Sequence, residues 1–357
     1  MSTTLEISEL ERKIGQLFMS GMPGTRLDEG TASLIRDYHL GGIILFSRNI
    51  EDPIQLAELC RDLHGAAAAS QDIPFLLAVD QEGGRVARLQ EPFRIFPGNA
   101  AIGEHDQPVE QAMEFGFVTA REMKLVGLNM NMAPVMDVRR GETEQHLEDR
   151  TFGENPEQVS QLGRTVIRSI QANGVMAVAK HFPGLGRAGV DPHVSLPRIE
   201  MDETEMEEIH LPPFRTAIDE GVSSIMTSHA IYPLFDPERP ATLSPIVLTE
   251  LLRERLCFEG LIITDDLEMG AITEHWSVSE GAARALEAGG DILLICKNQE
   301  NVVESFKHIR GRILRGEITM QRLQESYERI SKAKQKYLGK KPVISLPEVK
   351  EYFRLEP

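Results

Sequence analysis

The sequence predicts an α/β protein, a single (β/α)8 barrel of the TIM type with long loops and terminal extensions. Two observations support this prediction. Eight short apolar runs recur along the 357 residues, and longer amphipathic stretches separate them. Most of the runs are continuously apolar, which is typical of parallel strands covered on both faces. Eight such strands alternating with helices close most simply into a barrel, and an open doubly wound sheet is the structural alternative.

In chain order, the predicted strands cover residues 17–22, 41–49, 75–81, 128–138, 175–182, 223–230, 260–267 and 291–296. Helical patterns lie between them, most clearly at 156–174 and 279–290. For the second of these helices, Ser279 is the expected N-cap and Gly289–Gly290 the expected stop. A barrel needs roughly 250 residues, so the remainder supplies loops and ends. We expect one domain over residues 1–340, followed by a C-terminal tail or helix over 341–357.

Composition excludes several classes of partner. The chain has 38 Lys and Arg against 55 Asp and Glu, a net charge of −17, which argues against nucleic acid or an anionic membrane as partner. The first residues are acidic and lack the apolar core of a signal peptide, and no run approaches the ~20 apolar residues of a membrane span. Three cysteines without CxxC spacing argue against a disulfide scaffold. We therefore expect a reduced cytoplasmic protein, monomeric or a small homo-oligomer, without stable membrane association.

Ionisable residues follow five of the predicted strands. Burying such a group at a strand end is costly unless it is paired or binds a ligand. In a barrel, the carboxyl ends of all strands converge on one face, where barrel enzymes carry their active sites. The sequence therefore predicts an active site built on Asp80, Asp137, Lys180–His181, His229 and Asp265–Asp266.

The segment 180–197, KHFPGLGRAGVDPHVSLP, is predicted to be a long loop after the fifth strand. It contains a GxGxxG pattern, but the prolines that bracket it oppose the helix that a dinucleotide site requires. Within the loop, Asp191 and His193 occupy alternate positions, so both side chains can point the same way in an extended segment. A carboxylate bonded to an imidazole orients the ring and raises its basicity, as in the base half of a catalytic triad.

Two further segments carry candidate side chains. ITDDLEM (263–269) ends a strand with two carboxylates: Asp265 suits a nucleophile or a stabiliser of positive charge, and Asp266 suits a helix N-cap. DQEGGRVARL (80–89) places Asp80, Arg85 and Arg88 near a Gly-Gly turn, where they suit sugar hydroxyls. A structural ion pair is the alternative for both arginines, more so for Arg85 than for Arg88.

A metal centre is the alternative to these roles. Several of the candidate residues are possible zinc ligands. Barrel metallohydrolases usually bring an H-x-H pair from the first strand, and residues 17–22 contain none. We therefore expect no metal site.

Taken together, the motifs resemble glycoside hydrolase family 3, in particular its bacterial cytoplasmic β-N-acetylhexosaminidases that recycle cell-wall muropeptides. The resemblance follows the family's order from residue 14 to about 296. It rests on IGQLFMSG, GGIILFSRN, DQEGGRVARL, NMNMAPVMDV, DRTFGENP, KHFPGLG…DPH…LP, MTSHAIYP, PATLS, GLIITDDLEM and AGGDILLIC.

This resemblance implies a TIM-type barrel and retaining, exo-acting hydrolysis of terminal N-acetylglucosamine through a covalent glycosyl-enzyme, without a cofactor. By motif position, Asp265 is the implied nucleophile, and His193, held by Asp191, is the implied general acid and base. The implied substrate is a small carbohydrate, a muropeptide or chitooligosaccharide. The residues implied to grip its sugar ring are Asp80, Arg88, Arg150, Lys180 and His181. The roles of Asp137 and His229 stay open.

Two positions depart from the family pattern. Leu185 stands where the family usually has a second His, and Pro192 stands where it usually has Ser. Asp191 and His193 are present, so catalysis is still expected, whereas rate or substrate preference is open to change. The alternatives are a β-glucosidase or another glycosidase on the same barrel, and a catalytically weakened sugar-binding protein. A single Trp, Trp276, argues for a short substrate rather than a long polysaccharide.

Overall fold

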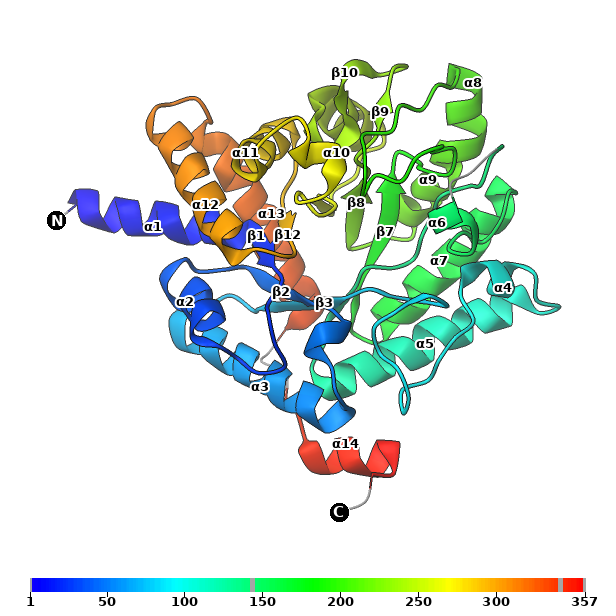
Figure 1. Ribbon diagram of the computed structural model, residues 1–357, viewed down its shortest axis with the longest axis horizontal. Coiled ribbons are helices and arrows are strands. Elements are labelled where there is room, and N and C mark those ends of the chain that lie inside the picture. Colours follow the sequence, from blue (N-terminus) through cyan, green and yellow to red (C-terminus); the bar gives the residue numbers. More distant parts are fainter. Residues whose placement is uncertain (1, 142–144, 340–342, 356–357) are drawn as a thin grey trace.

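A barrel of eight parallel strands forms the centre of the protein (Figure 1). The computed structural model describes residues 2–141, 145–339 and 343–355. The strands are β1 (Phe18–Ser20), β2 (Gly42–Leu45), β3 (Leu76–Val79), β6 (Met130–Asn131), β7 (Met176–Phe182), β8 (Ser224–Thr227), β11 (Leu261–Ile263) and β12 (Leu293–Ile295). Each lies inside one of the eight predicted strands.

The strand order β11-β8-β7-β6-β3-β2-β1-β12 leaves one seam, between β11 and β12. A parallel bridge between Ile263 and Ile292 joins the two sides of that seam. The backbone amide of Thr264 donates to the carbonyl of Ile292 at 2.9 Å, and that of Leu267 to Leu294 at 2.9 Å. The sheet therefore closes, as the sequence predicts, and the open-sheet alternative is wrong.

Helices surround the barrel in Figure 1. The longer ones are α1 (Ser2–Gln16), α2 (Glu29–Asp37), α3 (Pro53–Ser70), α5 (Pro108–Val126), α7 (Pro156–Ala172), α9 (Leu211–Asp219), α11 (Val278–Ala288), α12 (Gln299–Leu314), α13 (Met320–Leu338) and α14 (Leu346–Phe353), with the π-helical η4 (Ile246–Arg255). Short elements in the loops are α4 (Asn99–Gly103), α6 (Gln145–Glu148), α8 (Glu203–Glu205), α10 (Gly270–Thr273), η1 (Ser47–Asn49), η2 (Met206–His210), η3 (Ala241–Leu243) and the hairpins β4 (Gln81–Gly83) with β5 (Val86–Ala87) and β9 (Ile231–Tyr232) with β10 (Asp236–Pro240).

One predicted helix cap is wrong. The N-cap of α11 is Ser277, whose side chain accepts from the backbone amide of Glu280, rather than Ser279. The helix thus begins at Val278, and the Ser279 hydroxyl bonds to that of Ser277 at 3.1 Å. At the other end Gly289 has φ of 123°, so the predicted glycine stop is confirmed.

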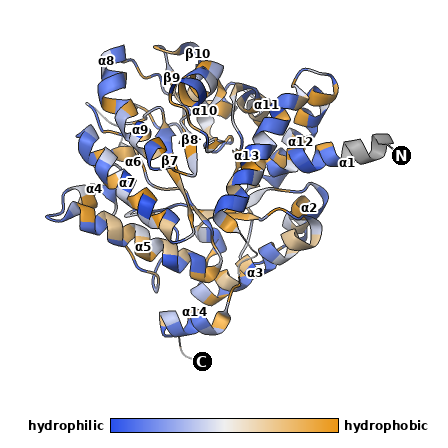
Figure 2. Cartoon of the chain, turned by 180° about the vertical axis from the view of Figure 1, so that it is seen from behind, coloured by the Kyte–Doolittle hydropathy of each residue, from blue (hydrophilic) through white to orange (hydrophobic). Residues whose placement is uncertain are grey.

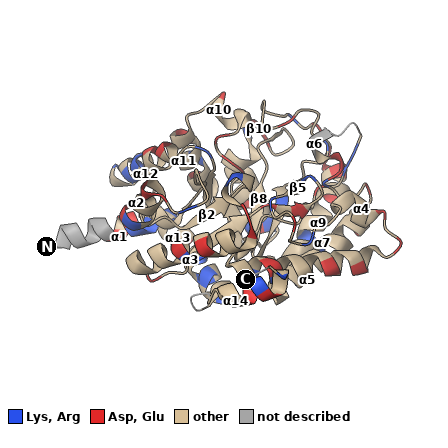
Figure 3. Ribbon diagram, turned by 60° about the horizontal axis from the view of Figure 1, so that its bottom comes forward, with Lys and Arg blue, Asp and Glu red and all other residues tan. Residues whose placement is uncertain are grey.

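Apolar side chains fill both the interior of the barrel and the layer beneath the helices. All residues of the eight barrel strands are buried, including the ionisable Lys180 and His181 of β7. Figure 2 shows the apolar strands at the centre and mixed polar and apolar residues on the surrounding helices. Lys, Arg, Asp and Glu are interspersed along those helices in Figure 3. This pattern explains why the strands read as continuous apolar runs.

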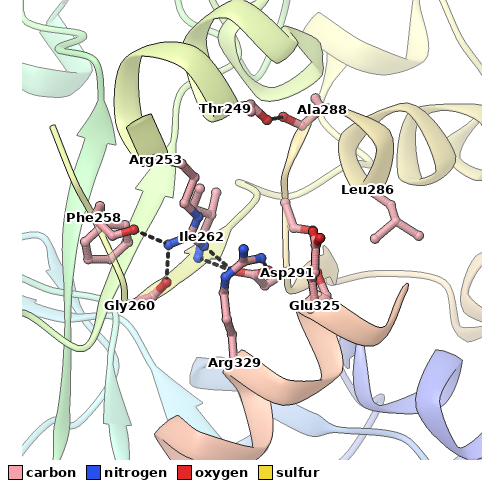
Figure 4. A network of polar contacts seen from close by, with 12 residues as sticks. Thr249, Arg253, Phe258, Gly260, Ile262, Leu286, Ala288, Asp291, Glu325 and Arg329 are labelled. Atoms are coloured by element: carbon pink, nitrogen blue, oxygen red, sulfur yellow. Dashed lines mark hydrogen bonds and ion pairs between the residues drawn. The ribbon is translucent and has the colours of Figure 1, made fainter. Parts of the chain in front are cut away.

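A buried ionic network ties α13 and η4 to the seam strands (Figure 4). Asp291 is fully buried and accepts from Arg253 at 2.5 Å and from Arg322 and Arg329 at 3.3 Å each. The other oxygen contacts of Arg253 are the carbonyls of Phe258 and Gly260, both at 2.6 Å.

Near the end of the chain, α14 packs against the barrel helices. Val349 and Phe353 are buried, and the Phe353 ring meets that of Phe93 edge-on with centroids 4.7 Å apart. Residues 346–353 are thus a packed helix. The expected domain boundary at 340/341 lies outside the described residues. Among the helices of the described ranges, none combines the length and apolar character of a membrane span.

Candidate active site

A cavity of about 340 Å³ lies at the carboxyl ends of the strands. The residues that line it lie near the ends of seven of the eight strands or in the segments that follow those strands. The side chains are Ile44, Phe46, Arg48, Asp80, Glu82, Val86, Arg88, Arg150, Lys180, His181, Leu185, Pro192, His193, Met226, Asp265, Asp266, Met269, Leu294, Cys296 and Lys297. Eight residues were given a catalytic or sugar-binding role by the family resemblance; seven of them are in this lining, and the eighth, Asp191, bonds to His193.

Asp265 lies two residues beyond β11 and faces the cavity. Its Oδ1 accepts the backbone N–H of Asp266 at 2.8 Å. Burial opposes ionisation of Asp265, but the nearby His229, His181 and Lys180 and the Asp266 amide outweigh it and hold its pKa below the usual range. Asp265 is therefore an ionised carboxylate in a partly enclosed site, which is the form that attacks an electrophilic carbon.

Asp191 and His193 form the pair that their spacing predicts. The Asp191 Oδ1 lies 2.8 Å from His193 Nδ1 and also accepts the His193 backbone N–H at 2.9 Å. Nδ1 is the ring nitrogen that the Asp191 carboxylate holds, so proton exchange at the second ring nitrogen, Nε2, is the chemistry that this pair can offer. The His193 side chain is 62% exposed, so it lies at the mouth of the cavity and is accessible to a leaving group.

Beneath the mouth, four charged side chains form a network in which Lys180 and Glu82 are buried and Asp80 and Arg150 are partly exposed. Lys180 Nζ lies 2.9 Å from Asp80 Oδ1 and 2.7 Å from Glu82 Oε1, and Arg150 meets Glu82 in a bidentate pair at 2.8 and 2.9 Å. Burial opposes charge on Glu82, but Arg150 and Lys180 overcome it and hold its pKa far below the usual range. Burial likewise opposes charge on Lys180, yet Asp80 and Glu82 raise its pKa.

Glu82 was missed in the sequence prediction. It follows Asp80 by two residues at the end of the same strand segment, and its side chain is 1% exposed. That i, i+2 spacing after a predicted strand was the available signal, because alternate residues of an extended chain point the same way. Arg88 completes the group: its guanidinium lies 3.6 Å from Asp80, and it is partly exposed.

Arg85 lies outside this cavity. It pairs with Asp149 at 2.8 Å, and both side chains are largely exposed, so the structural ion pair considered for Arg85 is the correct reading.

Asp137 and His229 support the lining rather than form it. Fully buried Asp137 accepts from His181 Nδ1 at 2.7 Å and from the Leu185 amide at 2.6 Å, which fixes the His181 ring and the start of the loop. Burial lowers the pKa of His229, although the nearby Asp265 carboxylate opposes this. Its Nε2 donates to the carbonyl of Asp266 at 3.0 Å, because a carbonyl only accepts, and its Nδ1 lies 2.7 Å from the Thr242 hydroxyl oxygen.

The sequence suggested Asp266 as the N-cap of the helix that follows it, and this prediction is wrong. The Asp266 Oδ1 accepts from the amides of Glu268 and Cys296, at 3.1 and 3.2 Å, and the N-cap of α10 is Met269. Within the described ranges, no three His, Cys, Asp or Glu side chains gather as metal ligands.

Comparison with known proteins shows the family of the chain. The family model "Glycosyl hydrolase family 3 N terminal domain" matches residues 9–333. The beta-hexosaminidase of Nitrosomonas eutropha is 38% identical over 291 residues, 80% of this chain and 82% of that protein.

Solved structures give the same result. A family 3 beta-N-acetylglucosaminidase from Paenibacillus sp. FPU-7 superposes with a TM-score of 0.91 at 36% identity, covering 96% of this chain and 68% of that one. The Beta-N-acetylhexosaminidase from Beutenbergia cavernae gives 0.85 at 29% identity, covering 91% and 98%. The barrel, its cavity and these relatives together identify the protein as a glycoside hydrolase, and the chain belongs to glycosyl hydrolase family 3.

Proposed function

We propose that the protein is a retaining, exo-acting β-N-acetylglucosaminidase that removes terminal N-acetylglucosamine from muropeptides or chitooligosaccharides. One observation carries the proposal: ionised Asp265 and the Asp191–His193 pair meet at one cavity whose floor is a charged network. The cavity volume of about 340 Å³ is at the small end of ligand pockets, which favours the end of a sugar chain over its interior.

In the first step, an Asp265 oxygen attacks the anomeric carbon while the bond to the leaving oxygen breaks. His193 Nε2 gives its proton to that oxygen, and Asp191 favours the imidazolium form needed beforehand. In the second step, neutral His193 takes a proton from water as the water attacks the same carbon and releases Asp265. The two displacements leave the configuration unchanged. Carboxylate and imidazole suffice for this chemistry, so we propose that it needs no cofactor.

The charged network supplies the sugar-binding groups in this proposal. Asp80 and Arg88 lie together at the cavity, and Lys180, His181 and Arg150 line it as donors. Because Glu82 and Asp80 hold Lys180 in place, its donors are aimed before the sugar arrives, which lowers the entropy cost of binding. Charged donors and acceptors of this kind suit the ring hydroxyls and the N-acetyl group.

The cellular setting is part of the proposal. Cys60 and Cys296 are buried free thiols and Cys257 is an exposed one, which suits a reducing compartment such as the cytoplasm. We propose recycling of cell-wall fragments there as the role.

The test is an assay with chromogenic N-acetyl-β-glucosaminides on the wild type, Asp265→Asn and His193→Ala. We expect Asp265→Asn to lose about a thousandfold or more in kcat/KM with every substrate, because no nucleophile remains. His193→Ala should fail mainly with poor leaving groups, which need the proton. Turnover that survives Asp265→Asn would contradict the nucleophile role.

Three controls separate the alternatives. Faster turnover of the glucoside than of the N-acetylglucosaminide would identify a β-glucosidase. N-acetylglucosamine binding without turnover by the wild type would identify a sugar-binding protein. Activity lost to a chelator and restored by a metal ion would identify a metal-dependent hydrolase.

A further inference from the structure

The loop that carries His193 rests on the short helix that follows Asp265. The amide of Gly270 donates to the carbonyl of His193 at 3.2 Å, and the amide of Ala271 donates to that of Pro192 at 3.1 Å. Gly270 is the first residue of α10, and only four residues separate it from Asp265. Two backbone hydrogen bonds thus join the segments that carry the two proposed catalytic groups.

The loop and α10 can approach each other this closely because Gly270 has no side chain. A Cβ there would lie 2.5 Å from the carbonyl oxygen of Val194 and 2.9 Å from that of His193. Real Cβ atoms do not come so close to backbone oxygen, so any other residue at this position must displace the loop or the helix. The φ of Gly270 is not positive, so glycine provides room here rather than unusual backbone geometry.

We expect the loop, rather than α10, to move when a side chain is added at position 270. His193 and Val194 are exposed by 62% and 69%, whereas Ala271 and Ile272 of α10 are fully buried. The beginning of the same loop is held separately, by the Leu185 amide on Asp137 and by the Tyr232 hydroxyl on the Gly184 carbonyl at 2.9 Å. A side chain at position 270 is therefore expected to displace residues 192–194 and leave the barrel in place.

We propose that Gly270 is a positioning residue for the acid/base step: its lack of a side chain lets the loop seat on α10 with His193 over the cavity. The inference rests on the proposed function, because it assigns to Gly270 the placement of the proton donor. Proton transfer needs Nε2 within hydrogen-bond reach of the leaving oxygen, so a shift of even 1 Å in this loop weakens the acid without touching the nucleophile.

The experiment compares Gly270→Ala with Gly189→Ala. Gly189 lies in the same loop, and a Cβ there meets nothing within 4 Å, so this variant is the matched control. Each is assayed with a dinitrophenyl and a phenyl N-acetyl-β-glucosaminide, beside the wild type and His193→Ala. For Gly270→Ala we expect kcat/KM to fall about tenfold or more with the phenyl substrate, which needs the proton, and less than about threefold with the dinitrophenyl one. Gly189→Ala should match the wild type with both.

Equal losses with both substrates would assign Gly270 a merely structural role, and no loss would show that the contact does not position His193; either result overturns the inference. If Gly270→Ala does not fold, Pro192→Ala carries the same test, because it loosens the residue whose carbonyl meets Ala271. A wild type without turnover, or a His193→Ala variant without leaving-group dependence, would instead overturn the proposed function.

Discussion

At the scale of single residues, the neighbouring Asp265 and Asp266 show how local environment separates two identical side chains. The cations around the cavity hold the pKa of Asp265 below its usual range. Asp266 is buried, and that burial, with the negative charges of Glu268 and Asp265, raises its pKa to about 6 even though two amides donate to it. Sequence alone assigns both the same chemistry, and the difference comes from what surrounds each one.

The raised pKa of Asp266 makes stability depend on pH. Because the folded state holds this proton more tightly than the unfolded one, the stabilisation is complete below pH about 4 and is lost as pH rises through about 6. A shift of this size corresponds to about 3 kcal/mol. Asp266→Asn keeps an oxygen acceptor without the charge. We expect its free energy of unfolding to exceed that of the wild type by about 3 kcal/mol at pH values well above 6 and to match it near pH 4.

Urea unfolding of both proteins at several pH values between 4 and 8 measures this gap. Asp219→Asn, at an exposed position at the end of α9, is the control and should show a constant difference from the wild type. A gap that stays the same from pH 4 to 8 in Asp266→Asn would contradict the assignment.

At the scale of elements, Asp291 connects β12 to α13 and η4 through three arginines. The same carboxylate accepts the Ser326 hydroxyl at 2.7 Å and the Ile262 amide at 3.0 Å. Removing its charge leaves arginines buried without a full counter-charge, a change that typically costs about 3 to 5 kcal/mol.

We therefore expect Asp291→Asn to lower the free energy of unfolding by about that amount while kcat/KM at low temperature stays near the wild-type value, because Asp291 does not line the cavity. Chemical denaturation and the chromogenic assay measure the two quantities. A fall in activity without a fall in stability would show that the network acts on the site.

Element positions were largely predictable. All eight strands lie where the continuous apolar runs predict, because a strand covered on both faces needs an unbroken apolar sequence. The cap of α11 was misplaced by two residues, because Ser277 and Ser279 are equally good caps by type and only the backbone path selects between them.

At the scale of the whole molecule, α14 joins the end of the chain to the outer side of the barrel. Val349 and Phe353 are buried, and the Tyr352 hydroxyl donates to Glu122 of α5 at 3.3 Å. A chain ending at Gly339 would expose the surface that these side chains cover. Burying a side chain of this size contributes about 2 kcal/mol, so we expect the truncation to lower the free energy of unfolding by about 4 kcal/mol.

The truncated protein should keep the wild-type kcat/KM at 25 °C, because no residue of α14 lines the cavity. Thermal unfolding and the chromogenic assay test this, with Phe353→Ala as a point variant that removes one ring. Unchanged stability would show that residues 341–357 are a tail rather than part of the folded body.

The sequence by itself determined the number and order of the strands along the chain, the face on which the cavity lies, and the pairing of Asp191 with His193. Each follows from short-range rules: apolar runs, polar residues at strand ends, and two side chains at alternate positions. Only the tertiary structure decided that Glu82 holds Arg150 and Lys180, that Asp137 fixes His181, and that Gly270 meets the His193 loop. These contacts join residues 44 to 98 positions apart, and their strength depends on burial and approach distance, which local sequence patterns do not specify.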